Sequence, residues 1–329
     1  MGGIETRIVD GEETGMRLDR WFKLHYPGLG FGQLQKLLRS GQIRVDGGRA
    51  KSDTRITKGQ TVRLPPKVTG LDGDKASARP LTGATIRDRH DRDVLEAMLL
   101  HEDKKVFVFN KPAGLAVQGG SGVSRHVDAM LESMRSQKGE KPRLVHRIDR
   151  ETSGILVVAR TRGAAAQLTA AFRARETDKT YWAICKGVPK KPQGRISTWL
   201  LRERTPDGDR MRVVPHGEPD ADHSESLYRV IEIAGQNLSW LELKPVTGRT
   251  HQLRVHTAHI GNPIIGDPKY FDIENWEFPG GIQKRLHLHA RRIRIPHPDG
   301  GWLDVSAPLP PHMVQTFNLL ALDEANPEA

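Results

Sequence analysis

The sequence predicts an α+β (mixed α/β) fold with two domains. The larger is expected to be a mainly antiparallel sheet with flanking helices, and the smaller to stand at the N-terminus. With 329 residues, the chain exceeds one typical domain. Strand patterns recur through its C-terminal two thirds, with few helices between them to make the crossovers of a parallel sheet. A helix pair followed by short strands precedes this region.

The N-terminal elements follow from apolar spacing and turn residues. Residues 1–15 are polar and Gly-rich, and we expect a flexible N-terminus there. Apolar residues at helical spacing predict two helices, the second ending at Gly41. Asp46-Gly47 predicts a hairpin turn. The predicted elements are helices from residue 16 to about 27 and at 31–40, and strands at 43–45 and 61–64.

The remainder of the chain divides into a linker, a large domain and a tail. Residues 68–92 mix Gly, Asp, Pro and basic residues without a period, which is typical of a linker. It separates a domain at 16–67 from one at 93–322, and 323–329 is expected to be a tail. In the large domain, helices are predicted at 93–100, 127–136 and 163–173, and strands at 105–109, 155–159, 180–185, 227–233, 238–243 and 291–295.

Charge narrows the class of partner. The formal net charge is +11, which favours a polyanion, either nucleic acid or an anionic membrane surface. Residues 16–67 hold twelve Lys or Arg against three Asp, so most of the excess lies in about fifty residues. A scattered solvated surface would not concentrate charge in this way, and we therefore expect nucleic-acid contact. With no long apolar run, no signal-like start and only Cys185, a cytoplasmic protein is expected.

The stretch from His146 to Arg160 is the strongest catalytic candidate. Five charged or titratable residues in six positions lead through Thr-Ser-Gly into a run of apolar residues. This pattern places the carboxylate of Asp149 at the mouth of a rigid strand. Considered alone, the pattern favours a solvated loop with weak ion pairs. The other motifs must decide between these readings.

Two Gly-containing turns and one aromatic strand come next. Asn110 to Gly114 predicts a sharp turn with Lys111 at its rim. The run Gly119 to Gly122 lacks the spacing of a phosphate-binding loop, so we reject a nucleotide site there. Tyr181 begins a strand, where it either packs in the core or offers a flat face to a nucleobase.

Residues 247–256 hold two Arg and two His within eight positions. The histidines of the chain match no zinc spacing and lack a thiolate or acidic cluster, so we predict no metal site and favour structural or RNA-contacting roles, including one for His251. Arg249 and Arg254 are better interpreted as partners of an anion, either phosphate or Asp149 itself.

Taken together, the motifs resemble those of the RluA-type pseudouridine synthases. The matching stretches, in chain order over residues 100–297, are Lys-Pro-x-Gly, His-Arg-Ile-Asp-x-x-Thr-Ser-Gly, Lys-x-Tyr, Gly-Arg-Thr-His-Gln-Leu-Arg-Val-His and Gly-Asp-x-x-Tyr. Residues 16–67 resemble the S4 RNA-binding module, in which a helix pair and a small sheet present a basic face to structured RNA. The resemblance implies isomerisation of uridine to pseudouridine, with no cofactor.

The resemblance also implies roles for individual residues. Asp149 is the catalytic carboxylate, Tyr181 stacks on the base, Arg254 pairs with Asp149, and Arg147 adjoins the carboxylate in sequence; a neighbouring Arg favours the charged form of a carboxylate. Either a nucleophilic attack at C1′ or proton removal at C2′ remains open. The implied partner is large-subunit ribosomal RNA or a ribosome precursor. A monomer is the default expectation for the oligomeric state. The expected RNA-binding residues are Arg17, Lys36, Arg39, Arg44, Lys111, Arg249 and His251.

Three other functions fit the sequence less well. An RNA-binding or ribosome-assembly protein without activity would tolerate loss of the catalytic residues, and all are present. A uracil-releasing glycosidase would need a second carboxylate as general acid, for which Glu151 is the only near candidate. A basic membrane-surface protein is disfavoured because neither basic helix has a broad Lys-rich amphipathic face.

Overall fold

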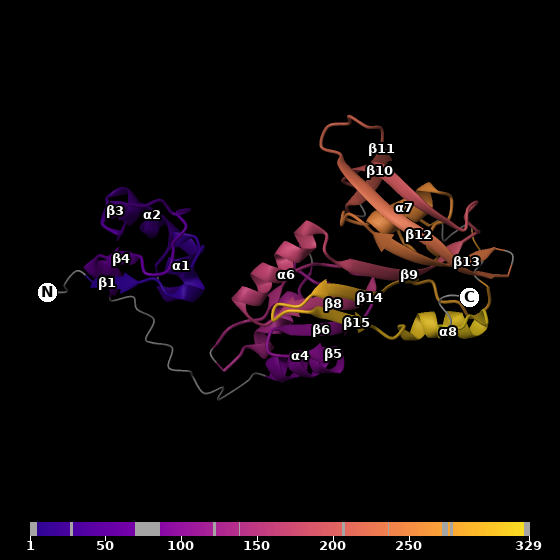
Figure 1. Cartoon of the computed structure of the whole chain (residues 1–329), viewed down its shortest axis with the longest axis horizontal. Helices are drawn as coiled ribbons and strands as arrows, with labels where there is room; N and C mark the ends of the chain where they lie inside the picture. The colour runs from indigo at the N-terminus through magenta and orange to yellow at the C-terminus, as the bar shows by residue number, and fades with distance from the viewer. Residues whose placement is uncertain are drawn as a thin grey trace. The chain divides into compact units, whose positions relative to one another are not determined.

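The chain divides into two units, Met1–Gly83 and Ala84–Ala329 (Figure 1). The computed structural model describes residues 5–26, 29–69, 86–120, 123–137, 139–205, 208–235, 237–271, 276 and 279–325. Residues 70–85 of the predicted linker, Ser121 and Gly122 of the Gly-rich run, and the last four residues of the predicted tail lie outside the described residues.

The smaller unit packs two helices against a four-stranded sheet of order β1-β4-β2-β3. Trp21 and Phe22 of the first helix and Leu37 and Leu38 of the second are buried in its core. The turn at Asp46-Gly47 has both residues at positive φ, as predicted. The elements are β1 (Glu5–Ile8), the 3₁₀ helix η1 (Gly11–Glu13), α1 (Leu18–His25), α2 (Phe31–Arg39), β2 (Arg44–Val45), β3 (Gly48–Arg49), β4 (Thr61–Leu64) and α3 (Pro66–Thr69).

Strand β1 corrects the expectation of a flexible N-terminus. All four of its residues are exposed, so no apolar alternation marks it in the sequence. It forms because its backbone pairs antiparallel with β4, from Glu5 opposite Leu64 to Ile8 opposite Thr61. Pairing with a buried strand therefore supplies the order that its own side chains do not.

The larger unit contains a mixed sheet of eleven strands, with a principal order β11-β10-β12-β13-β9-β14-β8-β6-β5. Strand β15 pairs with β14, and β7 pairs with β8. Among the described strands, only β8 and β14 pair in parallel, as the predicted mainly antiparallel sheet requires. The strands are β5 (Leu99–Glu102), β6 (Val106–Lys111), β7 (Arg143–Leu144), β8 (Ser153–Ala159), β9 (Asp178–Lys186), β10 (Gln193–Glu203), β11 (Arg210–Val214), β12 (Asp222–Ala234), β13 (Leu238–Pro245), β14 (Leu288–Pro296) and β15 (Trp302–Ser306).

Helices cover both faces of this sheet. The described helices are α4 (Ile86–Ala97), α5 (Val127–Met130), the 3₁₀ helix η2 (Leu131–Met134), α6 (Arg162–Ala174), α7 (Gln252–His259) and α8 (Pro311–Leu319). Strand β8 is buried throughout because its side chains alternate between two cores. Ile155 and Val157 pack towards α6, whereas Leu156 and Val158 pack towards α4, α5 and η2. None of the described helices has the length and apolar composition that a bilayer crossing requires.

Strand β9 has the same two-sided packing at the centre of the sheet. Trp182 and Ile184 share a core with α8, and Ala183 and Cys185 share one with Leu253 of α7. Figure 1 shows α6 beside β8 and α7 beside β12, which leaves the sheet surface between these two helices to form the site.

Several elements differ from their predictions. The predicted helix at 93–100 is α4, which ends at Ala97, because Leu99 pairs with Phe109 and starts β5. Strands β10, β11 and β15 and helices α7 and α8 were not predicted. Strand β10 mixes Gly, Ser, Thr and charged residues with a few apolar ones, so its sequence shows no sustained apolar alternation. Helix α7 has buried polar residues on most sides and so lacks an apolar stripe.

Candidate active site

A cavity of about 530 Å³ lies on the sheet surface between α6 and α7. Its size is within the range of sites that enclose a small organic group. The structure brings together six of the residues predicted for the site, since all six line the cavity: Arg147, Asp149, Tyr181, Arg249, His251 and Arg254.

The turn that carries Asp149 is fixed by its neighbours. The Nε2 atom of His146 accepts a hydrogen bond of 2.8 Å from the backbone N–H of Val157, and its ring stacks on Phe172. Burial lowers the pKa of His146 to about 3, so the imidazole is neutral and able to accept. The first residue of the His-Arg-Ile-Asp motif is therefore a structural acceptor that holds the turn against β8.

Gly154 lets β8 approach β14 directly after that turn. Its φ is +105°, and a Cβ atom there would lie 2.3 Å from the carbonyl oxygen of Ala290. These two residues pair in parallel across the sheet. Only glycine accommodates both the backbone conformation and the close approach. The Thr-Ser-Gly part of the motif thereby sets how near Asp149 lies to the central strands.

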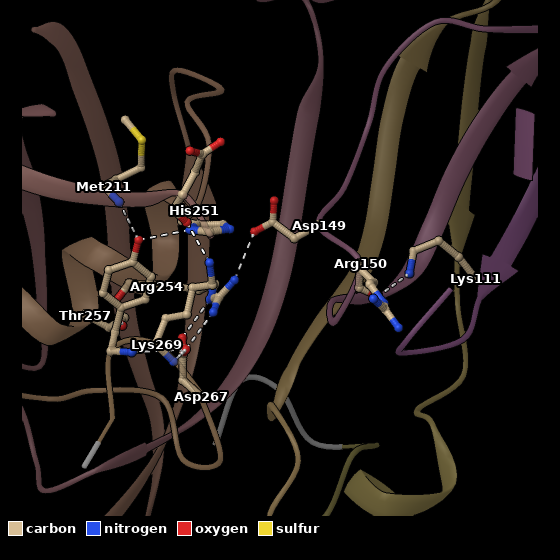
Figure 2. Close-up of polar contacts among 11 residues, drawn as sticks. Lys111, Asp149, Arg150, Met211, His251, Arg254, Thr257, Asp267 and Lys269 are labelled. Carbon is tan, nitrogen blue, oxygen red and sulfur yellow. Dashed lines mark hydrogen bonds and ion pairs between the residues drawn. The ribbon is translucent and has the colours of Figure 1, made fainter. Parts of the chain in front are cut away.

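Arg254 is held between two carboxylates (Figure 2). Its Nε and Nη2 atoms donate to Asp267 at 2.7 and 2.6 Å, and its Nη1 atom lies 3.7 Å from Asp149. Arg254 and Asp267 are almost completely buried, whereas 20% of the Asp149 side chain is exposed. Burial alone lowers the pKa of Arg254, but the hydrogen bonds and charge of Asp267, together with Asp149, raise it above its ordinary value. The guanidinium therefore stays charged beside Asp149.

Asp267 is a site residue that the sequence reasoning missed. It lies in the Gly-Asp-x-x-Tyr stretch, but its role as the fixed partner of Arg254 was not predicted. Besides Arg254, it accepts hydrogen bonds from the backbone N–H groups of Lys269 and Tyr270. The signal available in the sequence was an acid that follows Ile264-Ile265-Gly266 and precedes Pro268, within the recognised Gly-Asp-x-x-Tyr stretch.

Tyr181 lies on β9, opposite Leu243 of β13 and Ala290 of β14. Burial, and then the negative charge of Asp149, raises the pKa of its hydroxyl above the ordinary value. The phenol is therefore protonated at neutral pH. It offers the cavity an aromatic ring and an intact O–H group.

The lining is strongly positive around a single acid. Asp149 is the only carboxylate among the cavity residues, which include six Lys or Arg. Three of these were missed as site residues, Arg173 and Arg175 near the end of α6 and Lys179 at the start of β9. A cavity of this charge attracts a phosphate-bearing ligand and leaves one carboxylate for chemistry.

Gln252 fixes the loop that enters α7. Its Oε1 atom accepts from the Thr247 hydroxyl at 2.6 Å and from the Arg249 N–H at 3.0 Å. Its Nε2 atom donates to the Glu225 carbonyl and the Ser226 hydroxyl, both at 2.8 Å. All four hydrogen-bonding positions of this buried amide are thus used. The network ties the cavity wall at residues 247–249 to β12.

His251 faces the cavity from the residue that precedes α7. Its φ is +52°, and its Nδ1 atom lies 2.9 Å from the hydroxyl of Tyr270. That hydroxyl also accepts a hydrogen bond of 2.8 Å from the backbone N–H of Met211, on β11 (Figure 2). Burial lowers the pKa of His251 to about 4.

Lys111 corrects the prediction of an RNA-contacting residue at the rim of a turn. Its side chain is fully buried. The Nζ atom donates to the carbonyl oxygens of Pro112, Leu115 and Arg150 at 2.9 to 3.0 Å, which uses every proton of an ammonium group. Burial lowers its pKa to about 7. Lys111 therefore fastens two loops together beside Asp149 and presents no charge to a ligand.

The other predicted contacts lie on the surface. Arg147 is exposed at the cavity and, in the part of the chain that the structure describes, forms no ion pair with Asp149. Arg249 pairs with Asp222 at 3.2 Å. In the smaller unit, Lys36 and Arg39 are exposed on α2. There, Arg17 pairs with Asp19, and Arg44 donates to the carbonyls of Gly41 and Gly47.

The remaining histidines of the motifs are structural. His256 is buried, with Nε2 at 3.0 Å from Thr198 Oγ1 and Nδ1 at 2.9 Å from Ser226 Oγ. His287 and His289 are likewise buried and hydrogen-bonded. Throughout the described ranges, no three His, Cys, Asp or Glu side chains gather in a way that would hold a metal ion.

The sequence and fold of this chain are similar to those of known proteins. A family model described as RNA pseudouridylate synthase matches residues 105–259. Ribosomal large subunit pseudouridine synthase C of Vibrio parahaemolyticus is 33% identical over 99% of this chain and 100% of its own. RNA pseudouridine synthase 4, mitochondrial, of Arabidopsis thaliana is 34% identical over 92% of this chain and 78% of its own. The solved structure of human RNA pseudouridylate synthase domain containing 4 aligns with a TM-score of 0.60 at 29% identity, covering 71% of this chain and 97% of that one.

Proposed function

The chain belongs to the RNA pseudouridylate synthase family, and on this premise we propose that it isomerises specific uridines of large-subunit ribosomal RNA, with Asp149 as the catalytic carboxylate. The enzyme class is that of the family, a pseudouridine synthase. The choice of RNA rests on the names of the relatives, several of which are ribosomal large subunit pseudouridine synthase C. We expect the reaction in the cytoplasm, where bacterial ribosomes are assembled.

One observation supports the role of Asp149 above others. Among the described residues that line this positively charged cavity, Asp149 is the only carboxylate. It lies 3.7 Å from the buried Arg254, whose charge is maintained by Asp267. Glu151, the alternative acid for a uracil-releasing glycosidase, lies 3.5 Å from Arg150 and is not part of the cavity lining. A single carboxylate suits an isomerisation, in which no water has to be activated.

The reaction exchanges one bond for another within the same nucleotide. The N1–C1′ bond breaks, the uracil turns, and C5 bonds to C1′; the proton lost from C5 is balanced by the one gained at N1. Asp149 acts on the ribose, either as nucleophile at C1′ or as base at C2′. The guanidinium of Arg254, 3.7 Å away, places a positive charge beside this carboxylate.

The other cavity residues prepare the nucleotide. A uridine must leave its base stack to enter, at a cost of a few kcal/mol. Stacking on the ring of Tyr181 offsets part of this cost, because a base on an aromatic side chain contributes about 1–3 kcal/mol. Arg147, Arg249 and the basic residues of α6 and β9 are placed to hold the flanking phosphates.

We also propose that residues 16–67 form an S4 RNA-binding domain, that residues 68–92 join it to a catalytic domain at 93–322, and that the enzyme acts as a monomer. The helix pair α1 and α2 beside a small sheet agrees with this proposal. Arg17, Lys36, Arg39 and Arg44 are its candidate RNA contacts. A second basic surface would raise affinity without adding sequence information at the target base.

The test compares ribosomal RNA from cells that lack the gene, carry it, or carry Asp149→Asn. Pseudouridines are mapped by reverse-transcription stops after carbodiimide treatment. We expect specific large-subunit uridines to lose modification in the first and third strains and to regain it in the second. The purified variant should fold and bind RNA as the wild type does, with activity lower by at least about 10³-fold, the order of a lost catalytic base. Unchanged large-subunit pseudouridines in the deletion strain would refute the proposed substrate, and activity of Asp149→Asn would refute its role.

A further inference from the structure

The hydrogen bonds around Tyr270 determine which nitrogen of His251 carries its proton. The Tyr270 oxygen accepts from the backbone N–H of Met211 at 2.8 Å, so its own proton is free to be donated. The acceptor within reach is His251 Nδ1, at 2.9 Å. If Nδ1 carried the proton, the phenol would accept two hydrogen bonds, and the described residues show no other acceptor for its own proton. We therefore infer that Tyr270 donates to Nδ1 and that Nδ1 is unprotonated.

The remaining proton of a neutral imidazole then belongs to Nε2. His251 is neutral near pH 7, because burial lowers its pKa to about 4. With Nδ1 as the acceptor, the ring is the Nε2–H tautomer. The β11 backbone and Tyr270 therefore fix not only the orientation of His251 but also its donor.

This donor lies opposite the catalytic carboxylate. In Figure 2 the His251 ring nitrogen without a dashed line, which is Nε2, points towards Asp149. Both side chains line the cavity, and in the described chain they share no direct hydrogen bond or ion pair. The cavity thus presents an N–H donor that points towards a carboxylate acceptor, and a ligand atom at the position between them would meet both.

We propose that this position binds the ribose 2′-hydroxyl of the target nucleotide, which accepts from His251 Nε2–H and donates to Asp149. A group there must accept on one side and donate on the other. A hydroxyl does both, whereas a uracil carbonyl only accepts and the uracil N3–H only donates. The proposal rests on the proposed function and extends it: His251 would make the enzyme select RNA over DNA at the reacting nucleotide.

The substitutions at His251 form a matched pair. Asn is well tolerated at positive φ, but its amide ends near the position of Nδ1 and delivers no donor to the cavity. Gln extends an N–H to about the position of Nε2. His259, which is exposed on α7, provides His259→Gln as a control on the same element. Circular dichroism and thermal melting confirm that each variant is folded.

The first measurement uses ¹⁵N-histidine-labelled full-length protein, and needs no turnover. Two-bond ¹H–¹⁵N spectra, assigned by difference from His251→Gln, should show the Nε2–H tautomer in the wild type and a mixture in Tyr270→Phe. Uridine 5′-monophosphate should shift the Nε2 signal, and its 2′-deoxy counterpart should not. An Nδ1–H tautomer, or equal shifts with both nucleotides, would overturn the proposal.

The second measurement is a double-mutant cycle, in which dissociation constants are compared for changes in the protein and in the target nucleotide. It uses the large-subunit RNA fragment identified by mapping, with uridine or 2′-deoxyuridine at the target. We expect the deoxy substitution to weaken binding about tenfold in the wild type, His251→Gln and His259→Gln, as one hydrogen bond predicts. His251→Asn should bind both fragments with the weaker affinity. If the losses of binding free energy from His251→Asn and from the 2′-deoxy substitution add together, the two groups do not interact, and the proposal is contradicted. If mapping finds no target, the proposed function fails, while the tautomer and nucleotide results still decide this inference.

Discussion

Arg254 donates two hydrogen bonds to Asp267 and turns its remaining nitrogen towards Asp149. The pair is buried, so water does not compete for these hydrogen bonds. Asp267 therefore determines where the positive charge beside the Asp149 carboxylate lies, although Asp267 does not line the cavity. The proposed division of roles, in which Asp267 fixes the arginine and Asp149 reacts, can be tested by removing each acid in turn.

Asp267→Asn should destabilise the protein and impair catalysis together. The substitution removes the charged, doubly hydrogen-bonded partner of a buried guanidinium and leaves only Asp149, at 3.7 Å; breaking a buried pair in this way typically costs about 3–5 kcal/mol. The control is Asp304→Asn, which breaks an exposed two-bond pair with Arg292 and should cost less than about 1 kcal/mol. Urea denaturation gives both values. Equal and small losses would show that Asp267 does not fix Arg254.

Arg254→Lys should separate stability from activity. Lysine keeps the charge but cannot donate to Asp267 in the two-pronged manner of a guanidinium while also facing Asp149. We expect a loss of about 10²-fold or more in kcat, of the order of a lost electrostatic contact in a catalytic site, with little change in KM for RNA. Single-turnover kinetics with saturating enzyme measure the step directly. A change confined to KM would instead assign Arg254 to RNA binding.

Lys111→Met should loosen the turn next to Asp149. It removes the donor to three carbonyl oxygens, one of them the carbonyl of Arg150, the residue that follows Asp149. Buried carbonyls left without a donor cost about 1–3 kcal/mol, so both unfolding stability and kcat should fall. Because Lys111 is buried, the salt dependence of RNA binding should stay as in the wild type. A weaker salt dependence would restore the original prediction that it contacts phosphate.

Buried histidines predict a loss of stability in acid. Burial lowers the pKa of His251, His256, His287 and His289 to about 4 each, from an ordinary value of 6.5. Between pH 6.5 and 4 the unfolded chain therefore binds more protons than the folded one. The stability associated with these neutral, buried histidines is complete above pH 6.5 and is lost as the pH falls towards 4. The free energy of unfolding, measured by urea denaturation between pH 7.5 and 4.5, should fall with decreasing pH by an amount that corresponds to the uptake of more than one proton on unfolding. A free energy that does not change over this range would contradict these burial effects.

The sequence predicted those parts of the site that depend on local order. Asp149, Tyr181 and Arg254 were placed in one site from their motifs, and the cavity contains all three. Lys111 was misassigned, because a lysine next to Pro and Gly gives no local sign that three carbonyls converge on it. Asp267 was missed for a related reason. Its partnership with Arg254 depends on how α7 packs against the following loop, which is a long-range relationship.

The fold shows the same limit. Strands of the centre, such as β8, β9 and β13, were predicted because burial on one or both faces leaves a clear apolar pattern. Strand β1 has four exposed residues and exists through backbone pairing alone. Helix α7 buries Gln252, Arg254 and His256, so its pattern is polar where a helix normally shows an apolar stripe. Elements whose order comes from polar networks are not visible in hydrophobic periodicity.

The basic surface of the smaller unit predicts a change in salt dependence. Lys36 and Arg39 are exposed on α2, and replacing both with Ala should weaken binding of large-subunit RNA and lower the slope of log Kd against log salt by about 0.7–0.9 for each lost phosphate contact. The matched control replaces Arg195 and Arg292, which are exposed in the larger unit and paired with Glu225 and Asp304. It removes the same charge and should leave the slope nearly unchanged. Filter binding from 50 to about 300 mM salt measures both. If the two double variants give the same slope, the effect is one of net charge, and the smaller unit makes no specific phosphate contact through α2.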